Sequence, residues 1–448
     1  MRKEDEILEK EIKLFAEEFI KKLDNKEAYI ISHFDTDGIT SASIMVATLK
    51  KLDKKFSLRI VKSLDEKFIN NLPKDKMIVF LDLASGSLNH IKNAKLKDVF
   101  IIDHHEITQE IPENVKIINT QLLNKQKISA SGLTYLFSKQ INPETKELSK
   151  LAILGMIGDC LEKEIDSLNN GILEESGIQR KRGLLIYPST RPVNRVLEYS
   201  SHPYIPEVTG NMKGVLELLR ETGLTPEKGK YKSLIELDEG EMKSLTTAIL
   251  LRNPKIKTKE LVGDIFLIKM FNKIEDARDL SAVINACSRS GKPELAIQYC
   301  LEISSSKKDV ELTHIKYKQN IVTGLNFAYE TEKIEGKGFV IINAQENIKD
   351  TMIGTIASII SNSSIYEEGT IIITMAYYDD KIKVSARTVG KKGRNLRELL
   401  ERIVNQTDGE VGGHEHAAGC LIHKTKEKEF LDLLKKNLEI EVIKIRDN

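Results

Sequence analysis

Short apolar runs separated by longer amphipathic segments dominate the first part of the chain. A helical pattern over residues 5–23 spaces its apolar positions at three and four: Leu8, Ile12, Phe15, Phe19 and Leu23. Apolar, β-rich runs follow at residues 28–32, 58–61, 77–82, 99–103 and 115–118, with helical patterns between them at 40–52 and 65–71. Strands that alternate with helices form parallel sheets whose strands read as continuous apolar runs. The sequence therefore predicts a doubly wound α/β domain against which the first helix packs.

The remainder of the chain predicts two further regions. Residues 129–330 are mostly helical in pattern, with loops near 187–192 and 202–209. A second α/β pattern has strands at 339–343, 370–376 and 381–387 and helices at 350–361 and 396–404, then a glycine-rich loop at 409–413 and a final helix and strand. A single core stops growing at roughly 250–300 residues, so 448 residues indicate several domains. We expect a catalytic domain over 1–190, a helical connecting region over 191–330 and a smaller α/β domain over 331–448.

Composition and charge narrow the class of protein. Charged residues make up 30% of the chain, which is typical of a soluble globular protein, and no apolar run approaches the roughly 18 residues of a membrane span. The first residues mix acidic and basic side chains without the apolar core of a secretion signal, which predicts a cytoplasmic protein. The four cysteines form no Cys-x-x-Cys pair, so neither a disulfide framework nor a zinc site is indicated. A net charge of +1 excludes a basic polyelectrolyte but allows a local groove for nucleic acid.

Acidic and imidazole side chains collect where the predicted strands end. The set comprises His33, Asp35, Asp37, Asp82, Asp103, His104 and His105, together with Asp159 after an apolar helical segment. In open parallel sheets the carboxyl ends of the strands meet at one edge, where ligands bind. Carboxylate and imidazole groups are the ligands that suit Mn²⁺ or Mg²⁺. The pattern therefore predicts a metal centre at this edge.

The spacing of the first motif adds detail to this prediction. His33, Asp35 and Asp37 alternate at steps of two, so in an extended chain they share one side, and Gly38 lets the backbone turn into the next helix. Two ions about 3.5–4 Å apart need a bridging carboxylate, and Asp82 from a central strand is the natural candidate. A lone aspartate after a strand is more often a helix cap than a ligand. Its coincidence with a double histidine favours the metal site.

In this order, the residues resemble the DHH phosphoesterase superfamily, which is named for the triplet that stands here as Asp103-His104-His105. The segment Gly412-Gly413-His414 is similar to the signature of the associated DHHA1 domain, and residues 276–291 resemble the archaeal relatives of the exonuclease RecJ. The resemblance implies a parallel-sheet DHH domain, a helical connecting region and a smaller α/β DHHA1 domain.

The resemblance also implies a role for each metal-site residue. One metal is implied to be held by His33, Asp35 and Asp82, and the other by Asp37, Asp82, His104 and Asp159. Asp103 is implied to orient a histidine, and His105 to face the substrate phosphate.

Substrate binding is implied for the second α/β domain. By default Arg387 is a surface arginine and Gly412-Gly413-His414 a turn, but the resemblance implies that they reach across an interdomain cleft to phosphates. His33 stands where bacterial RecJ usually has aspartate, whereas relatives that act on short oligonucleotides and manganese pyrophosphatases have histidine. The length of the substrate therefore stays open.

The expected function is that of a phosphodiester hydrolase with two Mn²⁺ or Mg²⁺ ions that acts as an exonuclease on single-stranded DNA or RNA. Family analogy suggests a replication complex or a repair helicase as partner. Three alternatives remain: a phosphatase or nuclease for very short oligonucleotides or nucleotide phosphates, a manganese pyrophosphatase, and a replisome scaffold related to DHH proteins. The pyrophosphatase signature Ser-Arg-Lys-Lys-Gln is absent from the sequence, and the scaffold is disfavoured because every metal ligand is kept.

Overall fold

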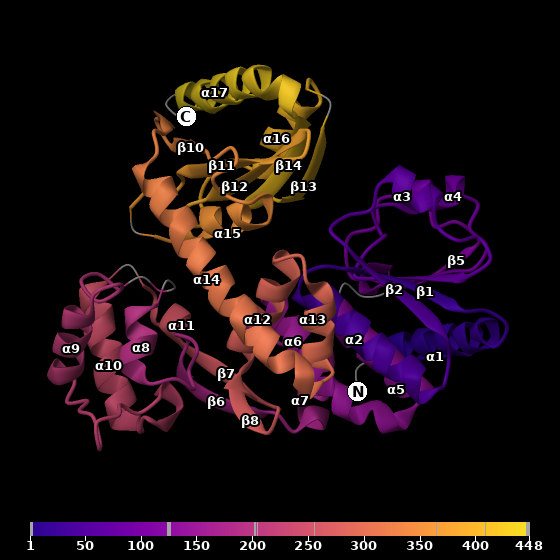
Figure 1. Ribbon diagram of the computed structural model, residues 1–448, viewed down its shortest axis with the longest axis horizontal. Helices are drawn as coiled ribbons and strands as arrows, with labels where there is room; N and C mark the ends of the chain where they lie inside the picture. The colour runs from indigo at the N-terminus through magenta and orange to yellow at the C-terminus, as the bar shows by residue number, and fades with distance from the viewer. Residues whose placement is uncertain are drawn as a thin grey trace. The chain divides into compact units, whose positions relative to one another are not determined.

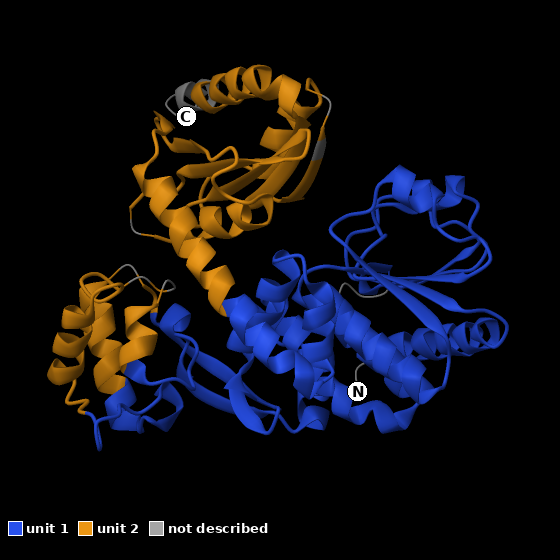
Figure 2. Ribbon diagram, in the orientation of Figure 1, with its two compact units in different colours: residues 1–193, 226–242, 258–314 blue, residues 194–225, 243–257, 315–448 orange. Residues whose placement is uncertain are grey.

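The computed structural model describes residues 3–122, 127–200, 203, 205–254, 256–363, 365–407 and 409–444. The chain forms two compact units, of residues 1–193, 226–242 and 258–314 and of residues 194–225, 243–257 and 315–448 (Figure 2). Within the described ranges, no helix combines the length and the apolar character needed to cross a membrane.

A five-stranded parallel sheet in the order β2-β1-β3-β4-β5 forms the centre of the first unit. Its strands are β1 (Ala28–His33), β2 (Phe56–Val61), β3 (Met77–Leu81), β4 (Val99–Ile102) and β5 (Val115–Ile118). Figure 1 shows α3 (Glu66–Asn70) and α4 (Leu88–Asn93) on one face, with α1 (Lys3–Leu23), α2 (Thr36–Lys51) and α5 (Ala130–Ile141) on the other. Every residue of β3 is buried, as expected for a central strand covered on both faces. The predicted parallel sheet is confirmed.

The N-terminal helix packs on this sheet through its apolar stripe. The ring of Phe15 lies edge-on to Phe100 of β4 and Phe137 of α5, at centroid distances of 5.2 and 5.4 Å. Phe19 contacts the same two rings at 5.2 and 5.0 Å. Edge-to-face pairs of this kind stabilise by about 0.5–1.5 kcal/mol beyond the area that they bury.

The rest of the first unit lies on the side of α2. It contains α6 (Ser149–Gly158), α7 (Ser167–Ser176), α12 (Ala277–Arg289) and α13 (Pro293–Cys300). A small antiparallel sheet joins β6 (Gln179–Leu184), β7 (Val262–Met270) and β8 (Lys273–Asp276). All three strands fall within residues 129–330, the stretch whose pattern predicts mostly helix. The run Ile265–Ile268 is apolar without alternation, and such a run does not distinguish a buried strand from a buried helix.

Short helices occupy the segment between β6 and β7. They are α8 (Val193–Glu198), α9 (Met212–Glu221), α10 (Glu239–Arg252) and α11 (Thr258–Leu261). An ion pair of 2.6 Å joins Arg252 of α10 to Glu221 of α9. Further along, the long helix α14 (Lys307–Glu330) begins in the first unit and ends in the second.

The C-terminal part of the second unit is a six-stranded mixed sheet in the order β13-β14-β12-β11-β10-β9. The strands are β9 (Ile334–Gly336), β10 (Phe339–Asn343), β11 (Ile371–Tyr378), β12 (Lys381–Thr388), β13 (Glu410–His414) and β14 (Ala417–His423). In Figure 1, α15 (Asp350–Ser361) lies on one face, and α16 (Leu396–Val404) and α17 (Glu427–Lys444) lie on the other.

Two details of this domain differ from the sequence-based expectation. The segment 409–413, expected as a glycine-rich loop, largely forms the edge strand β13, and the expected final helix and strand occur in the opposite order as β14 and α17. Glycine is depleted in strands, so the glycines of this segment predict a loop. The segment is nevertheless a strand because its backbone pairs with β14. Gly413 has φ +115° and lies so close to β14 that a Cβ atom there would come within 2.4 Å of the Ala417 carbonyl oxygen.

Candidate metal centre

Strand ends and helix ends of the first unit bring the predicted ligands together. His33 ends β1, Asp82 directly follows β3, and His104 lies two residues beyond β4. Asp159 caps the C-terminus of α6. Because β1, β3 and β4 are adjacent and parallel, their carboxyl ends meet at one edge of the sheet, where all these side chains are found.

One group of ligand atoms comprises His33, Asp35 and Asp82. His33 Nδ1 lies 2.9 Å from Asp35 Oδ2 and 3.4 Å from Asp82 Oδ2. Asp35 is also the N-cap of α2, and its Oδ1 accepts a hydrogen bond of 3.0 Å from the Gly38 amide. The cap and a ligand role are thus compatible, because each uses a different carboxylate oxygen.

A second group comprises Asp37, His104 and Asp159. His104 Nε2 lies 3.4 Å from Asp159 Oδ2, 3.4 Å from Asp82 Oδ1 and 3.9 Å from Asp37 Oδ2. Asp82 therefore presents one oxygen to each group. Its side chain is only 2% exposed, and neither of its oxygens has a hydrogen-bond partner within the described chain.

Buried carboxylate oxygens without hydrogen bonds fit a divalent cation. Asp159 Oδ2 shares this condition with both oxygens of Asp82. Leaving a buried charge without partners is costly unless it is paired or coordinates a metal. The set of four aspartates and two histidines, without cysteine, matches hard ions such as Mn²⁺ or Mg²⁺.

The charge balance of the metal-free cluster also favours the binding of divalent cations. Burial, followed by the charges of Asp35 and Asp37, raises the pKa of Asp82 to about 6. Burial, followed by the charges of Asp37, Asp82 and Asp35, holds the pKa of Asp159 well above its ordinary range. Burial lowers the pKa of His104, but the carboxylates around it outweigh this effect and raise it to about 9. The cluster thus holds protons against excess negative charge, and cations would displace them.

Asp103 is placed differently from the other aspartates. It is fully buried, and its Oδ1 accepts hydrogen bonds from the His104 amide at 2.8 Å and from His105 Nδ1 at 2.7 Å. Its Oδ2 accepts from the Ser85 amide at 3.0 Å. The His105 side chain is 52% exposed, and its Nδ1 lies 3.8 Å from Asp82 Oδ1. With Nδ1 engaged by Asp103, Nε2 is the nitrogen of this half-exposed ring that is available to a ligand.

The neighbourhood of Asp37 explains two glycines. Asp37 is buried in the first turn of α2, where its oxygens accept from the amides of Ala130 and Ser131 at 2.7 and 3.0 Å. A Cβ atom at Gly155 would lie 2.3 Å from Asp37 Oδ1, so α6 can approach only with glycine there. A Cβ atom at Gly38 would lie 2.3 Å from the His33 carbonyl oxygen. Gly38, in the first turn of α2, is thus required by a close backbone contact with the end of β1, whereas the spacing of the motif predicts a turn before the helix.

Helix α12 supports the loop between His33 and α2. Ser281 Oγ donates to Thr36 Oγ1 at 3.1 Å, and Ser288 Oγ donates to the Phe34 carbonyl. The Arg289 guanidinium lies 5.7 Å from the centroid of the Phe34 ring. These contacts fix the loop that carries Asp35. They were not predicted, since nothing in the sequence connects residues so far apart.

Asn285 is a further residue near this loop for which the sequence predicts no role. It lies on the same face of α12 as the two serines, at steps of four and three, and its Oδ1 is buried without a hydrogen bond among the described residues. The sequence marks Asn285 only by its helical spacing from Ser281 and Ser288. This spacing indicates a role only when α12 is known to contact the loop that carries Asp35.

In the second unit, Arg387 and His414 lie in register across three strands. Arg387 of β12 pairs with Ala417 of β14, which pairs with His414 of β13. Directly paired residues point to the same face, so the two side chains flank Ala417 at a separation of about two strand spacings, or ~10 Å. Arg387 Nε donates to Ser358 Oγ of α15 at 2.9 Å. His414 is exposed.

Known protein families and a relative match nearly the whole chain. The model of the DHH family N-terminal domain matches residues 27–158, the DHH-CID domain matches residues 186–259 and the DHHA1 domain matches residues 336–439. An uncharacterized protein of Methanocaldococcus jannaschii is 30% identical over 444 residues, which cover 94% of this chain and 96% of that protein. The chain belongs to the DHH phosphoesterase family.

Similarity to RecJ is found in both sequence and structure. The single-stranded-DNA-specific exonuclease RecJ of Bacillus subtilis is 26% identical over 168 residues, covering 34% of this DHH protein and 21% of that enzyme. RecJ of Thermus thermophilus, crystallised with Mn²⁺, superposes with a TM-score of 0.61 at 16% identity over 95% of this DHH protein. The DHH protein spans 54% of the length of that RecJ.

The same fold is found in Cdc45 from Entamoeba histolytica. The TM-score is 0.64 at 12% identity, covering 95% of this DHH protein and 99% of Cdc45. At such identities the likeness shows the fold alone. RecJ proteins have been crystallised with Mn²⁺ and with Mg²⁺, and the Asp/His cluster of this DHH protein is able to hold a metal.

Proposed function

We propose that this DHH protein is a metal-dependent phosphodiesterase that removes nucleotides from an end of single-stranded DNA or RNA, in replication or repair. The observation that carries the proposal is Asp82, a buried carboxylate without hydrogen bonds among the described residues that faces one His/Asp group with each oxygen. Such a residue suits two neighbouring cations. Hydrolysis of phosphodiesters assisted by a pair of cations is the chemistry that this donor set supports best.

In this proposal, His33, Asp35 and Asp82 hold one cation, and Asp37, Asp82, His104 and Asp159 hold the other. Mn²⁺ is preferred and Mg²⁺ is possible by the same chemistry, since carboxylates predominate. The ions, when bound, activate a water for attack on phosphorus and neutralise charge on the phosphate.

The chain's own residues then position the substrate. His105, held at Nδ1 by Asp103, donates from Nε2 to a phosphate oxygen as an imidazolium, a form that the hydrogen bond to Asp103 favours by raising the pKa of His105. This hydrogen bond strengthens as negative charge grows on the phosphate. We assign binding of further phosphates to Arg387 and to the strand Gly412-Gly413-His414. The planar guanidinium suits phosphate, and the two glycines leave the backbone of β13 open to close approach.

A preference for single strands, rather than very short oligonucleotides, is supported by the similarity to the single-stranded-DNA-specific exonuclease of Bacillus subtilis. The rival phosphatase or nuclease for very short substrates keeps the same metal residues and is separated only by dependence on length. A pure scaffold, the alternative that the Cdc45 fold suggests, has no need of unpaired buried carboxylates. A replication complex or repair helicase is the proposed setting.

The test follows products from DNA and RNA strands that are labelled at either the 5′ or the 3′ end, from dinucleotides upward, with Mn²⁺, Mg²⁺ or chelator. The proposal expects mononucleotides released in order from one end, only with added metal, and faster from longer strands. Asp159→Asn should abolish this release, and Asp53→Asn, an exposed aspartate outside the cluster, should leave it intact. Cleavage confined to dinucleotides would favour the rival, and no hydrolysis under any condition would favour the scaffold.

A further inference from the structure

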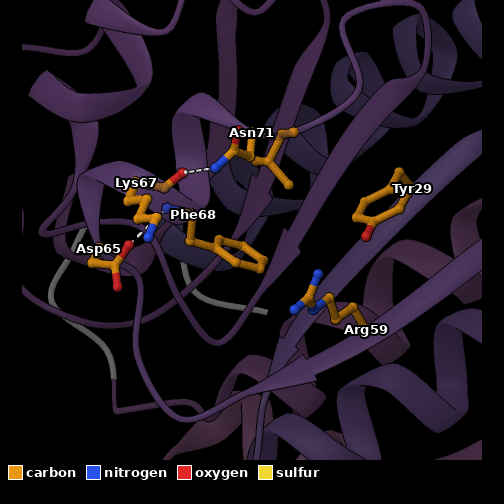
Figure 3. A pocket seen from close by; sticks show the side chains of 7 residues that line it. Tyr29, Arg59, Asp65, Lys67, Phe68 and Asn71 are labelled. Atoms are coloured by element: carbon orange, nitrogen blue, oxygen red, sulfur yellow. Dashed lines mark hydrogen bonds between the residues drawn. The ribbon is translucent and has the colours of Figure 1, made fainter. Parts of the chain in front are cut away.

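A cavity of about 260 Å³ lies on the sheet face that carries α3, in the first unit. Its walls come from β1, β2, α3 and the residues beside that helix: Tyr29, Arg59, Asp65, Lys67, Phe68 and Asn71. Figure 3 shows Tyr29, Arg59 and Phe68 around the same hollow. None of these residues belongs to the Asp/His cluster or to the proposed phosphate-binding residues of the second unit.

Flat groups dominate the walls of this cavity. The Arg59 guanidinium carbon lies 5.0 Å from the centroid of the Phe68 ring, a cation–π contact that holds the guanidinium over the ring. Arg59 pairs with Ile31 of β1, so its side chain points to the same face as Tyr29, two residues before Ile31. An aromatic ring from β1 and a ring-supported guanidinium from β2 and α3 thus share one space.

The polar groups give the cavity a net positive charge. Arg59 and Lys67 carry two positive charges against the single carboxylate of Asp65, and neither cation forms an ion pair within the described chain. Asp65 is committed to the backbone, since its Oδ1 accepts from the Phe68 amide at 2.7 Å. Asn71 Nδ2 donates to the Lys67 carbonyl oxygen at 2.8 Å, so the amide group is anchored through its nitrogen and its side-chain oxygen can accept from a ligand.

We propose that this cavity binds one nucleobase of a single strand, stacked on the planes of Arg59 and Tyr29, with Lys67 attracting the adjacent phosphate. Single-strand sites combine such stacking platforms with positive charge, and guanidinium planes stack bases as aromatic rings do. The volume is just below the ~300–1,000 Å³ of pockets for drug-sized ligands, which suits one nucleotide. An acidic peptide would contact the positive charges but would not need the flat faces of Arg59 and Tyr29 for stacking.

The proposal deepens the proposed function and rests on it. Tyr29 precedes the metal-site residue His33 by four residues on β1, a distance of about 13 Å along the strand. A strand whose end occupies the metal centre therefore has a base within a few nucleotides' reach of the cavity. The subsite supplies affinity for strands that a dinucleotide is too short to exploit.

The test measures binding by the full-length chain in chelator, where no strand is cleaved. Oligonucleotides carry a single abasic position that is moved one nucleotide at a time from the end. Wild type should lose affinity by about 5- to 150-fold at one position, the factor equivalent to ~1–3 kcal/mol per stacked base. Arg59→Gln, at an exposed side chain, should bind intact strands more weakly and lose nothing further at that position. The matched control Arg182→Gln, exposed on β6, should keep the wild-type profile.

Two results would overturn the subsite. One is a wild-type profile that is flat at every abasic position, and the other is an Arg59→Gln profile that keeps the wild-type dip. Deoxyadenosine monophosphate serves as a competitor, and Arg59-dependent binding of this nucleotide without any Arg59-dependent position in a strand would make the cavity a free-nucleotide site instead. Hydrolysis of a dinucleotide by wild type with Mn²⁺ is measured separately, so failure of the proposed function is distinguished from failure of the subsite.

Discussion

Replacing Asp82 with asparagine should stabilise the metal-free protein and at the same time remove its response to metal. Asp82 is buried, its oxygens have no hydrogen bonds within the described chain, and its backbone has φ +58°. Asparagine keeps the shape of the side chain and tolerates this left-handed conformation, whereas alanine would add backbone strain. Asp82→Asn therefore changes charge with little change in geometry.

The size of the stabilisation follows from the pKa of Asp82. Raising this pKa from its ordinary 3.8 to about 6 costs folding roughly 3 kcal/mol, at 1.36 kcal/mol for each tenfold change in proton affinity. Below pH 3.8 the carboxyl is protonated in both folded and unfolded chains, so the cost is absent. It grows as the pH rises toward about 6, where the folded group ionises, and is constant above. In chelator at neutral pH the variant should thus melt on the order of 10 °C higher, at ~2–4 °C per kcal/mol for a unit of this size.

Scanning calorimetry in chelator and in Mn²⁺, over a range of pH, measures both effects. Wild type should gain stability from Mn²⁺, and the variant should not. Residues that only hydrogen-bond to metal ligands already contribute ~10- to 100-fold to metal affinity, so loss of the shared ligand Asp82 should weaken Mn²⁺ binding by at least that factor. Asp53→Asn is the matched control, because Asp53 is exposed and has φ +52°. A variant that melts at or below the wild-type temperature in chelator would refute the electrostatic argument. Normal Mn²⁺ stabilisation and hydrolysis would refute the shared ligand.

Three further replacements test separate parts of the proposal. His105→Ala should lower kcat by about 10²- to 10³-fold with metal content unchanged, and a metal loss equal to that of His104→Ala would make His105 a ligand. Arg387→Ala should weaken the binding of long strands and make the plot of log K against log salt concentration shallower, by about 0.7 for each phosphate that is no longer neutralised. An unchanged slope would show that Arg387 does not bind substrate phosphates. Gly38→Ala should lower both melting temperature and metal affinity, because its Cβ atom would meet the His33 carbonyl oxygen at 2.3 Å, and unaltered calorimetry would show that α2 can shift freely.

The gathering of Asp and His residues could be predicted because it depends on few assumptions. Once β1, β3 and β4 are parallel neighbours, the residues that follow them must meet at one edge, whatever the exact helix boundaries. The apolar runs that define these strands are short and uninterrupted, and β5 begins and ends at the predicted residues. The roles of these Asp and His residues as metal ligands remain predictions.

Other features depended on contacts that the sequence does not encode locally. β13 contains two glycines and is a strand only because β14 supplies its partners. Gly155 looks like a small residue in an apolar helix until Asp37 is placed against it. The pairing of Arg59 with Phe68 joins an edge strand to the following short helix, and neither residue stands out in its own segment.

The support that α12 gives to the metal loop has a consequence for the order of assembly during synthesis. Every predicted ligand lies at or before Asp159. Yet Phe34, in the loop, and Thr36, the first residue of α2, bond to residues 254 and 245 positions later, Ser288 and Ser281. An emerging chain thus contains the whole donor set long before the helix that fixes it. Contacts over such separations form late, because closing a long loop must precede any gain from the contact. The first unit therefore acquires its predicted metal ligands early and their rigid arrangement only after the inserted helices α8 to α10 have been made.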